Sequence, residues 1–389
     1  MSQDFGIADD INARMVEWRR DFHRHPETAF EEHRTAQAVA DALTEMGIPV
    51  HRGLGGTGVV GTLQNGNGPS IGLRADMDAL DILELGAAAH KSTIPGKMHG
   101  CGHDGHTAML LGAAAQLART KPFRGTVRFI FQPAEENEGG GRRMVEDGLF
   151  DKFPADAVYG MHNIPNIPRG RFALREGVST AFLDTFEIVI TGRGCHAAMP
   201  EKGIDPIVVS ASLVSALQSI VSRRIGALES AVVSLTQIHG GDTWNVVPET
   251  LILRGTVRTL SARVQDQVEV EMGQICAGVA QTHGAKVDLT YARRYPGVIN
   301  TPAETTAAAQ AAIRLVGGNL VQTDLKPAMG SEDFSFMLQK RPGAYICIGA
   351  GEGPNDPPLH NPYYDFNDAI LPLGAAYWVE LVKQQLPAA

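Results

Sequence analysis

The middle of the chain constrains the fold most strongly, because the six elements predicted there follow the order β-α-β-β-α-β. Alternation of apolar and polar residues predicts the strands, and apolar residues at helical spacing predict the helices. Strands are expected at residues 184–191, 231–238, 250–259 and 286–292, and helices at 206–222 and 262–282. This order is that of a ferredoxin-like α+β unit. Because the unit is self-contained, we expect residues 182–295 to form an inserted domain.

The segments on either side of this block alternate helices with strands instead. Helices are expected at residues 8–23, 34–46, 105–119, 302–316 and 370–386, and strands at 59–63, 71–73, 126–131, 157–161 and 344–348. Such alternation is typical of a layered α/β domain. The chain has 389 residues, enough for two or three domains. We therefore predict a discontinuous α/β domain of residues 1–181 and 296–389.

The charge of the chain and its first residues exclude several classes of partner. Lys and Arg number 34, Asp and Glu number 43, the net charge is −9, and there is no block of basic residues. Such a chain is poorly suited to nucleic acid or to an anionic membrane. Residues 1–10 lack the basic and apolar regions of a signal peptide, and no apolar run approaches the roughly 18 residues of a membrane span. We expect a cytoplasmic protein with no nucleic-acid or membrane partner.

Residues 99–106 carry three His, one Cys and one Asp interleaved with Gly, in the order His-Gly-Cys-Gly-His-Asp-Gly-His. Cys and His are ligands of zinc-like ions, and glycines let the backbone curl around a metal. Cys101 and His103 are therefore candidate metal ligands. His106 opens the helix expected next, so we interpret it as an ordinary residue of a helix N-terminus. The chain's four cysteines are too few and too scattered for a disulfide scaffold.

Four further polar side chains follow predicted strands or lie in a stiff loop. Glu135 and Glu136 follow one predicted strand, His162 follows another, and His360 lies in a proline-rich loop. Sheets of α/β proteins bind ligands beyond the carboxyl ends of their strands. One carboxylate of the Glu pair could hold a metal while the other takes a proton from water. Together with the candidates in residues 99–106, these side chains supply enough ligands for two metal ions that share a bridging group.

Two more residues leave alternatives open. His196 lies among small residues in the inserted domain, where a His can approach a substrate closely or can cap the following helix. Ser70 lies in the sequence Gly-Pro-Ser-Ile-Gly, which matches the nucleophile elbow of serine hydrolases. That elbow needs a strand before the Ser and a helix after it, whereas here a turn precedes Ser70 and a strand follows. A serine hydrolase using Ser70 is the first alternative function.

Six motifs of the chain resemble those of one known family. They lie at residues 99–106, 132–136, 160–163, 194–198, 330–334 and 359–361. From Trp18 to Trp378 the chain resembles the dinuclear-metal amidohydrolases that include hippurate hydrolase, bacterial N-acyl-amino-acid aminoacylases and plant auxin-conjugate hydrolases. The resemblance implies a zinc-peptidase-like α/β catalytic domain that carries an inserted ferredoxin-like α+β lid. In this family the lid is often also the dimerisation surface.

The resemblance implies a set of metal ligands. Cys101 is expected to bridge two divalent ions, and His103, Glu136, His162 and His360 are expected to be the other ligands. Their sulfur, nitrogen and oxygen atoms fit Mn, Zn, Ni or Co.

The resemblance also implies roles beyond the metal ligands. Glu135 is expected to be the general base. His196 is expected to stabilise the oxyanion, either within its own subunit or across a dimer. Asn245 and Arg258 resemble positions that contact the substrate, although Arg258 has the alternative role of a strand residue in a salt bridge.

The chain departs from the peptidase branches of the wider superfamily at two places. Those branches have a His-x-Asp motif where this chain has Arg74-Ala75-Asp76, and an Asp where this chain has Cys101. The aminoacylase and hippurate branch shares both changes, which favours N-acyl amino acids over peptides as substrates. Asp76 and Asp104 are then expected to orient metal ligands without binding the metal themselves.

These observations predict metal-dependent hydrolysis of the amide bond of N-acyl amino acids, which releases a carboxylic acid and a free amino acid. By the same resemblance, the enzyme is expected to be a homo-oligomer, either a dimer or a tetramer. The second alternative is a metal-dependent binding protein on an inactive hydrolase scaffold. An intact Glu135 argues against that alternative, because a binding protein needs no general base.

Overall fold

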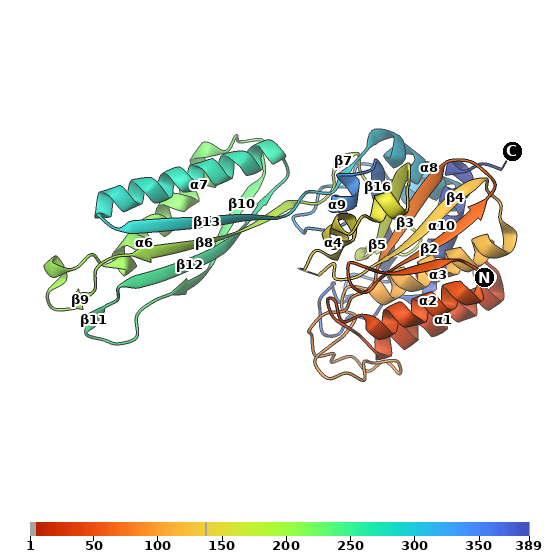
Figure 1. The fold of residues 1–389 in the computed structure, drawn as a ribbon, viewed down its shortest axis with the longest axis horizontal. Helices are drawn as coiled ribbons and strands as arrows, with labels where there is room; N and C mark the ends of the chain where they lie inside the picture. Colours follow the sequence, from red (N-terminus) through yellow and green to blue (C-terminus); the bar gives the residue numbers. More distant parts are fainter. Residues whose placement is uncertain (1–4, 137, 389) are drawn as a thin grey trace. The chain divides into compact units, whose positions relative to one another are not determined.

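The computed structural model describes residues 5–136 and 138–388. The chain divides into two compact units (Figure 1). The first contains the chain up to Ser179, Val298–Lys326 and the chain from Asp333 onward, and the second contains Thr180–Gly297 and Pro327–Glu332. Each unit is described by itself.

An eight-stranded sheet forms the centre of the first unit, with the strand order β1-β2-β4-β3-β5-β16-β6-β15. The neighbours β4, β3, β5 and β16 are parallel to one another. The strands are β1 (Val50–Leu54), β2 (Gly58–Asn65), β3 (Ser70–Asp76), β4 (Gly125–Gln132), β5 (Ala157–Pro168), β6 (Phe172–Ala173), β15 (Val321–Gln322) and β16 (Gly343–Gly351). Parallel strands covered by helices on both faces are typical of α/β proteins.

Helices cover both faces of this sheet. Successive residues of a strand point to opposite faces, and apolar side chains on each face pack against helices. Phe129 packs in one apolar cluster with helices α1 (Asp9–Arg24), α2 (His33–Glu45), α3 (His103–Thr120), α8 (Pro302–Val316) and α10 (Leu371–Gln385). Its neighbour Ile130 packs in another cluster with α4 (Gly140–Glu146), α5 (Leu149–Lys152) and α9 (Ser335–Leu338). Two cores therefore hold the sheet in place from both sides.

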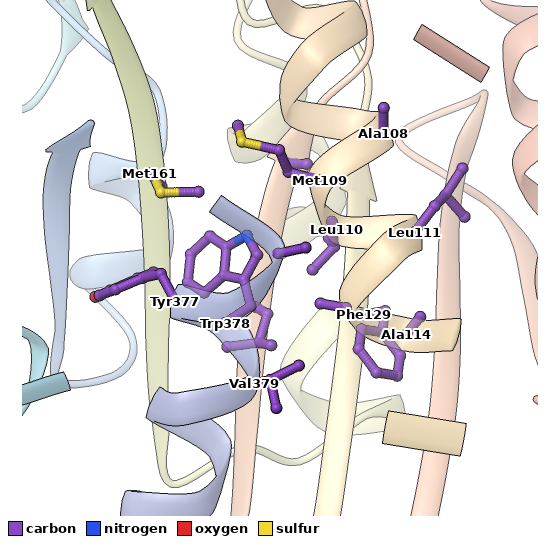
Figure 2. Packing of buried hydrophobic residues seen from close by; sticks show 14 of the residues in the cluster. Ala108, Met109, Leu110, Leu111, Ala114, Phe129, Met161, Tyr377, Trp378 and Val379 are labelled. Carbon is purple, nitrogen blue, oxygen red and sulfur yellow. The ribbon is translucent and has the colours of Figure 1, made fainter. Parts of the chain in front are cut away.

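The larger core is closed where α3 and α10 pack against the sheet. Figure 2 shows Met109 of α3 and Trp378 of α10 beside Met161 of β5, and all three side chains are at most 2% exposed. A Cβ added at Gly374 would lie 2.0 Å from the sulfur of Met109. Only glycine permits α10 to approach α3 this closely, so the position of α3, which carries two of the candidate residues, is set by core packing.

The second unit is the predicted ferredoxin-like sandwich. Its elements are β8 (Phe182–Thr191), α6 (Pro206–Ser219), β10 (Ala231–His239), β12 (Thr250–Thr259), α7 (Ala262–His283) and β13 (Lys286–Tyr295). The sheet order is β10-β12-β8-β13, and all neighbours are antiparallel. Both helices share one apolar core with the sheet. The β-α-β-β-α-β order and the α/β class of the chain are therefore confirmed.

Local sequence signals explain where the helices of this unit begin and end. The Asp205 carboxylate accepts a hydrogen bond from the backbone N–H of Ile207, and Pro206 occupies the first turn of α6. The Ser261 hydroxyl accepts from the N–H of Val264 at the start of α7, and Gly284 ends that helix with a φ of 68°.

No uninterrupted apolar run of about 18 residues was expected, yet one helical stretch of the described residues passes for a membrane span by length and mean composition, despite its interspersed Ser and Gln residues. The helical stretch Pro206–Arg224 has 19 residues and a mean hydropathy of 1.3. Its residues Val209, Leu213 and Leu217 pack into the core of the second unit. A helix that packs into a protein core can have the same length and composition, and this stretch packs into such a core.

The segment Pro327–Glu332 was expected in the α/β domain but packs with the second unit. The backbone N–H of Ala181 donates to the carbonyl of Gly330 over 3.0 Å, and Thr180 forms a β-bridge with Ala328. Short strands and helices that lack periodic patterns, such as β1, β6, β15 and α9, were not predicted. Two to five residues are too few for a period to be recognised.

Candidate metal centre

The candidate ligands of the first unit lie beyond the carboxyl ends of its parallel strands. Glu135 and Glu136 follow β4, and His103 is the first residue of α3. His162 was expected to follow a strand, but β5 continues to Pro168, so His162 lies near its middle, two residues beyond the last β5 residue paired with β3. Parallel strands end at the same edge of a sheet, so residues far apart in the sequence meet there.

Gly102 allows the loop before α3 to approach β5 closely. Its φ is +90°, and a Cβ at this position would lie 2.4 Å from Oδ1 of Asn163 and 2.8 Å from the hydroxyl of Tyr364. A side chain at residue 102 would therefore push Cys101 and His103 away from the strand that carries His162.

The predicted ligands form three overlapping groups. In each group one potential ligand atom per residue lies within 4.8 Å of the others. The groups are Cys101 with His103 and His162, Cys101 with Glu136 and His360, and His103 with Glu135 and Glu136. The Sγ atom of Cys101 lies 3.4 Å from Nε2 of His162, and Nε2 of His360 lies 3.1 Å from Oε1 of Glu136. Cys101, His103 and Glu136 each belong to two of these groups, and Cys101 is the residue shared by the group with His162 and the group with His360.

Asp78 orients two of these residues and was not identified from the sequence. Nδ1 of His103 lies 2.9 Å from the Asp78 carbonyl oxygen and 3.2 Å from its Oδ1. The second carboxylate oxygen of Asp78 accepts the backbone N–H of Glu136 over 2.9 Å. Asp78 could have been identified from its position as a second acidic residue just beyond β3. A carboxylate outside the coordination sphere commonly orients a metal-binding His.

Asp76 and His106 form a buried pair behind the candidate ligands. Oδ1 of Asp76 lies 2.6 Å from Nδ1 of His106, and Oδ2 accepts from Arg74 over 2.7 Å. Burial alone would raise the pKa of Asp76, but the positive charge of Arg74 and the neighbouring His103 and His106 hold it well below its usual range. His106 was expected to be an ordinary helix-start residue. That interpretation is wrong, because its side chain is buried and its Nε2 contacts Asn163 over 2.7 Å.

Asp104 lies in a second buried network behind the start of α3. Its Oδ2 accepts from Nε of Arg19 over 3.0 Å and lies 2.8 Å from Nδ1 of His23. Burial opposes the charged form of Asp104, but Arg19 and His23 keep its pKa far below its usual range. Asp104 therefore does not contact the candidate metal through its own carboxylate; it anchors the helix turn that carries His103.

Glu32 supports the loop that carries Glu135. The backbone of Ala134 has a φ of 53°, and its N–H donates to Oε1 of Glu32 over 2.9 Å. The hydroxyl of Thr57 donates to the other oxygen of this carboxylate. Burial and the nearby carboxylate of Asp78 raise the pKa of Glu32 to about 7. This distant carboxylate was also not predicted from the sequence.

The chemistry of the candidate ligands fits a divalent metal. Nε2 of His103 is buried and has no hydrogen-bond partner among the described residues, while Nδ1 of the same ring faces Asp78. The nearest recorded charged contact of Nε2 is Oδ2 of Asp76, at 3.7 Å. A ring with one nitrogen held by a carboxylate and the other without a hydrogen bond is the arrangement expected of a metal-binding His. Burial lowers the pKa of His162, which favours the neutral ring that metals bind. The chain therefore carries a divalent-metal site, and the thiol of Cys101, whose pKa burial raises, would ionise against a cation.

Ser70 is not placed for nucleophilic catalysis. It is the first residue of β3, at the amino end of this parallel strand. Its hydroxyl lies 3.4 Å from a carboxylate oxygen of Asp156, which also accepts its backbone N–H over 2.7 Å. A serine nucleophile needs an adjacent general base, for which His is the usual residue. Here a carboxylate holds Ser70 at the start of its strand.

The second unit places His196 and Asn245 close together. His196 lies on β9 (Cys195–His196), which pairs with β11 (Val246–Val247), and the N–H of Ala197 donates to the carbonyl of Asn245 over 3.0 Å. Both residues are exposed. Arg258 lies on β12, where its guanidinium donates to the hydroxyl of Ser331 over 3.0 Å. This partner is a hydroxyl and not the carboxylate that the alternative role in a salt bridge would require.

Comparisons with known proteins identify the family and agree with the fold. The model of peptidase family M20/M25/M40 matches residues 72–384. Hippurate hydrolase of Campylobacter jejuni is 39% identical over 97% of this chain and 98% of its own length. N-acetylcysteine deacetylase of Bacillus subtilis is 38% identical over 95% of this chain and 96% of its own. The structure of a dinuclear metal-binding peptidase of the M20 family from Bacillus subtilis has a TM-score of 0.84 at 34% identity, and covers 96% of this chain and 98% of the other.

Two independent features therefore agree. The first unit gathers sulfur, nitrogen and oxygen ligands at one edge of a zinc-peptidase-like sheet, and the family match extends over most of the chain. The protein is a metal-dependent hydrolase acting on amides and belongs to peptidase family M20/M25/M40.

Proposed function

We propose that this enzyme hydrolyses the amide bond of N-acyl amino acids and releases a carboxylic acid and a free amino acid. The observation that carries the proposal is the position of Glu135, a buried carboxylate within 4.8 Å of ligand atoms of His103 and Glu136. A carboxylate held beside a metal site is suited to proton transfer. Relatives at 38–39% identity are named for hydrolysis of hippurate and of N-acetylcysteine.

We assign the metal ligands as two sets that share one residue. Cys101 belongs to both sets, His103 and His162 complete one, and Glu136 and His360 complete the other. Two divalent ions held here (Mn, Zn, Ni or Co) would polarise the amide carbonyl and lower the pKa of water. Asp76, Asp78 and Asp104 keep these ligands in position from outside the coordination sphere.

Glu135 is assigned as the general base. It takes a proton from the water whose oxygen attacks the amide carbon, and it later donates that proton to the departing amine nitrogen as the C–N bond breaks. The Glu32 contact to Ala134 holds the loop that points Glu135 at this water. Water is thus split between the two products, with its hydroxyl on the acid and its proton on the amine.

Residues of the second unit are assigned to substrate recognition. His196 would donate a hydrogen bond to the oxygen of the tetrahedral intermediate, and Asn245 and Arg258 would contact the substrate. We further propose that the enzyme is a homo-oligomer, a dimer or a tetramer, that acts in the cytoplasm without nucleic-acid or membrane partners.

The experiment that tests this function measures amino acid release from a panel of N-acyl amino acids. N-benzoylglycine, N-acetylcysteine and indoleacetyl amino acids are each assayed with the purified enzyme, after chelation, and after Mn or Zn is restored. Release that the chelator abolishes and the metal restores is the expected result.

Two outcomes would contradict the proposal. Release that is indifferent to chelator but inhibited by a fluorophosphonate would support the alternative serine mechanism at Ser70. Metal-dependent binding of the panel without release of any product would support an inactive hydrolase scaffold.

A further inference from the structure

The first unit contains a cavity of about 620 Å³. The end of β5, the end of β16 and the loop 352–359 form its walls. Most of its lining is apolar, from Ile164, Pro165, Pro168, Pro354, Pro358 and Leu359. No residue with a role in the proposed reaction lines it.

Two of the walls are continuous with candidate metal ligands. Ile164 lies two residues beyond His162 on β5, so both side chains point to the same face of the strand, roughly 7 Å apart. Leu359 immediately precedes His360. Two parts of the cavity wall therefore begin within two residues of candidate metal ligands, within reach of a group attached to an amide held at the metal centre.

The loop that closes the cavity is held in a defined shape. A carboxylate oxygen of Asp356 accepts the backbone N–H of Glu352 over 2.6 Å and that of Gly353 over 3.0 Å. Glu352 in turn pairs with Arg169 over 3.0 Å. A preformed wall loses little conformational entropy when a ligand binds.

We propose that this cavity binds the acyl group of the substrate and selects uncharged apolar groups of aromatic or medium-chain size. This inference rests on the proposed function. A cavity of about 620 Å³ lies within the usual range for small-molecule sites, and an acetyl group would leave most of its apolar wall in contact with water. The Asp356 carboxylate, which accepts from backbone N–H groups, also lines the cavity, so an acyl chain that ends in a carboxylate is repelled. The charge of Glu352 is offset by its ion pair with Arg169.

The test compares kcat/KM for N-acetyl-, N-butanoyl-, N-hexanoyl-, N-benzoyl- and N-succinylglycine with the metal-loaded enzyme. Each buried methylene should raise kcat/KM about 4-fold. Hexanoyl and benzoyl substrates should therefore exceed acetyl by roughly 10²-fold, and succinyl should be the poorest.

Substitution of Gly353 tests whether this cavity causes the preference. Gly353 lines the cavity, and a Cβ there would meet no atom within 4 Å. Gly353→Trp should lower kcat/KM for the hexanoyl and benzoyl substrates at least 10-fold more than it lowers kcat/KM for acetylglycine, whereas Gly353→Ala should keep the wild-type order. Gly318→Trp is the matched control, since Gly318 has equally open surroundings and lies outside the cavity lining.

Binding of the free acids gives a second readout. Calorimetry should show hexanoate binding more tightly than acetate to the wild type, and Gly353→Trp should remove the difference. Hydrolysis with equal kcat/KM for acetyl and hexanoyl substrates would overturn the subsite alone. If none of the substrates is hydrolysed, the proposed function itself fails, and the inference fails with it.

Discussion

The two units differ in where they keep their polar side chains. In the first unit, Arg19, Arg74, Asp76, His103 and Asp104 are each at most 1% exposed. In the described part of the second unit, the buried polar side chains are few, and the candidate residues His196 and Asn245 are exposed. Burying a charge is costly unless it is paired. In the first unit, networks of paired charges offset that cost and hold the candidate site in one geometry, whereas the second unit buries fewer charged groups, Asp184 among them.

The comparison predicts that the largest loss of activity comes from the first unit. Glu135→Gln should lower kcat by about 10² to 10⁴-fold, because the amide cannot accept the proton. Metal content, measured by elemental analysis, should be unchanged, since the glutamine is nearly isosteric. Glu138→Gln, at an exposed position in the same loop, is the control. Turnover that persists in Glu135→Gln would remove the general-base assignment.

The second unit should contribute a smaller effect through His196. His196→Ala should lower kcat by about 10² to 10³-fold, the usual cost of one oxyanion donor, without changing metal content. His239→Ala, at an exposed position of the same unit, should leave kcat unchanged. If His196→Ala instead loses metal, His196 belongs with the ligands and the contrast between the units disappears.

The buried networks of the first unit should make its stability depend on pH. Burial lowers the pKa of His23, but its hydrogen bonds to Asp104 and Glu84 outweigh this and raise it to about 9. Because the folded pKa lies above the unfolded value of about 6.5, the stabilisation is complete below pH 6.5 and is lost as pH rises through about 9.

The variant His23→Gln measures this contribution. Relative to wild type it should lose roughly 3 kcal/mol in the free energy of unfolding at pH 6, and the difference should shrink at pH 10. Urea unfolding at the two pH values checks this. His33→Gln, at an exposed position of α2, is the control. A difference that does not change with pH would show that His23 is uncharged in the folded protein.

The smallest effect is expected in the second unit. The Tyr291 hydroxyl donates to Asp184 over 2.6 Å, and the Gln265 amide donates to the same carboxylate over 2.7 Å. Tyr291→Phe removes one of these two bonds and should cost about 1.5 kcal/mol, measured by thermal unfolding, with activity unchanged. Tyr363→Phe, at an exposed position, should have no effect. A loss as large as that of His23→Gln would mean that both units depend equally on buried polar networks.

Much of the fold could be predicted because apolar residues recur at regular spacing in its longer helices and strands. The helices α7 and α8 and the strand β12 begin and end within one residue of their predicted limits. Short elements such as β6 and β15 have no period and could not be predicted. The interpretation of His106 was wrong because it used only the position of this residue at the start of a helix. The contact that gives His106 its place is made by Asp76, thirty residues earlier in the chain.

The candidate ligands were identifiable from the sequence because Cys, His and Glu have few other reasons to gather at glycine-rich loops and strand ends. The residues that hold them were not. The partners of these supporting residues lie far away in the sequence: 25 residues for Asp78, 102 for Glu32 and 85 for Arg19. Nothing in the sequence distinguishes these three from the other acidic and basic residues of the chain. The sequence by itself determined the longer, periodic elements, their order and the types of ligand available to the candidate site. Only the tertiary structure decided which buried charges pair, because pairing depends on distance and burial, and no local pattern encodes either.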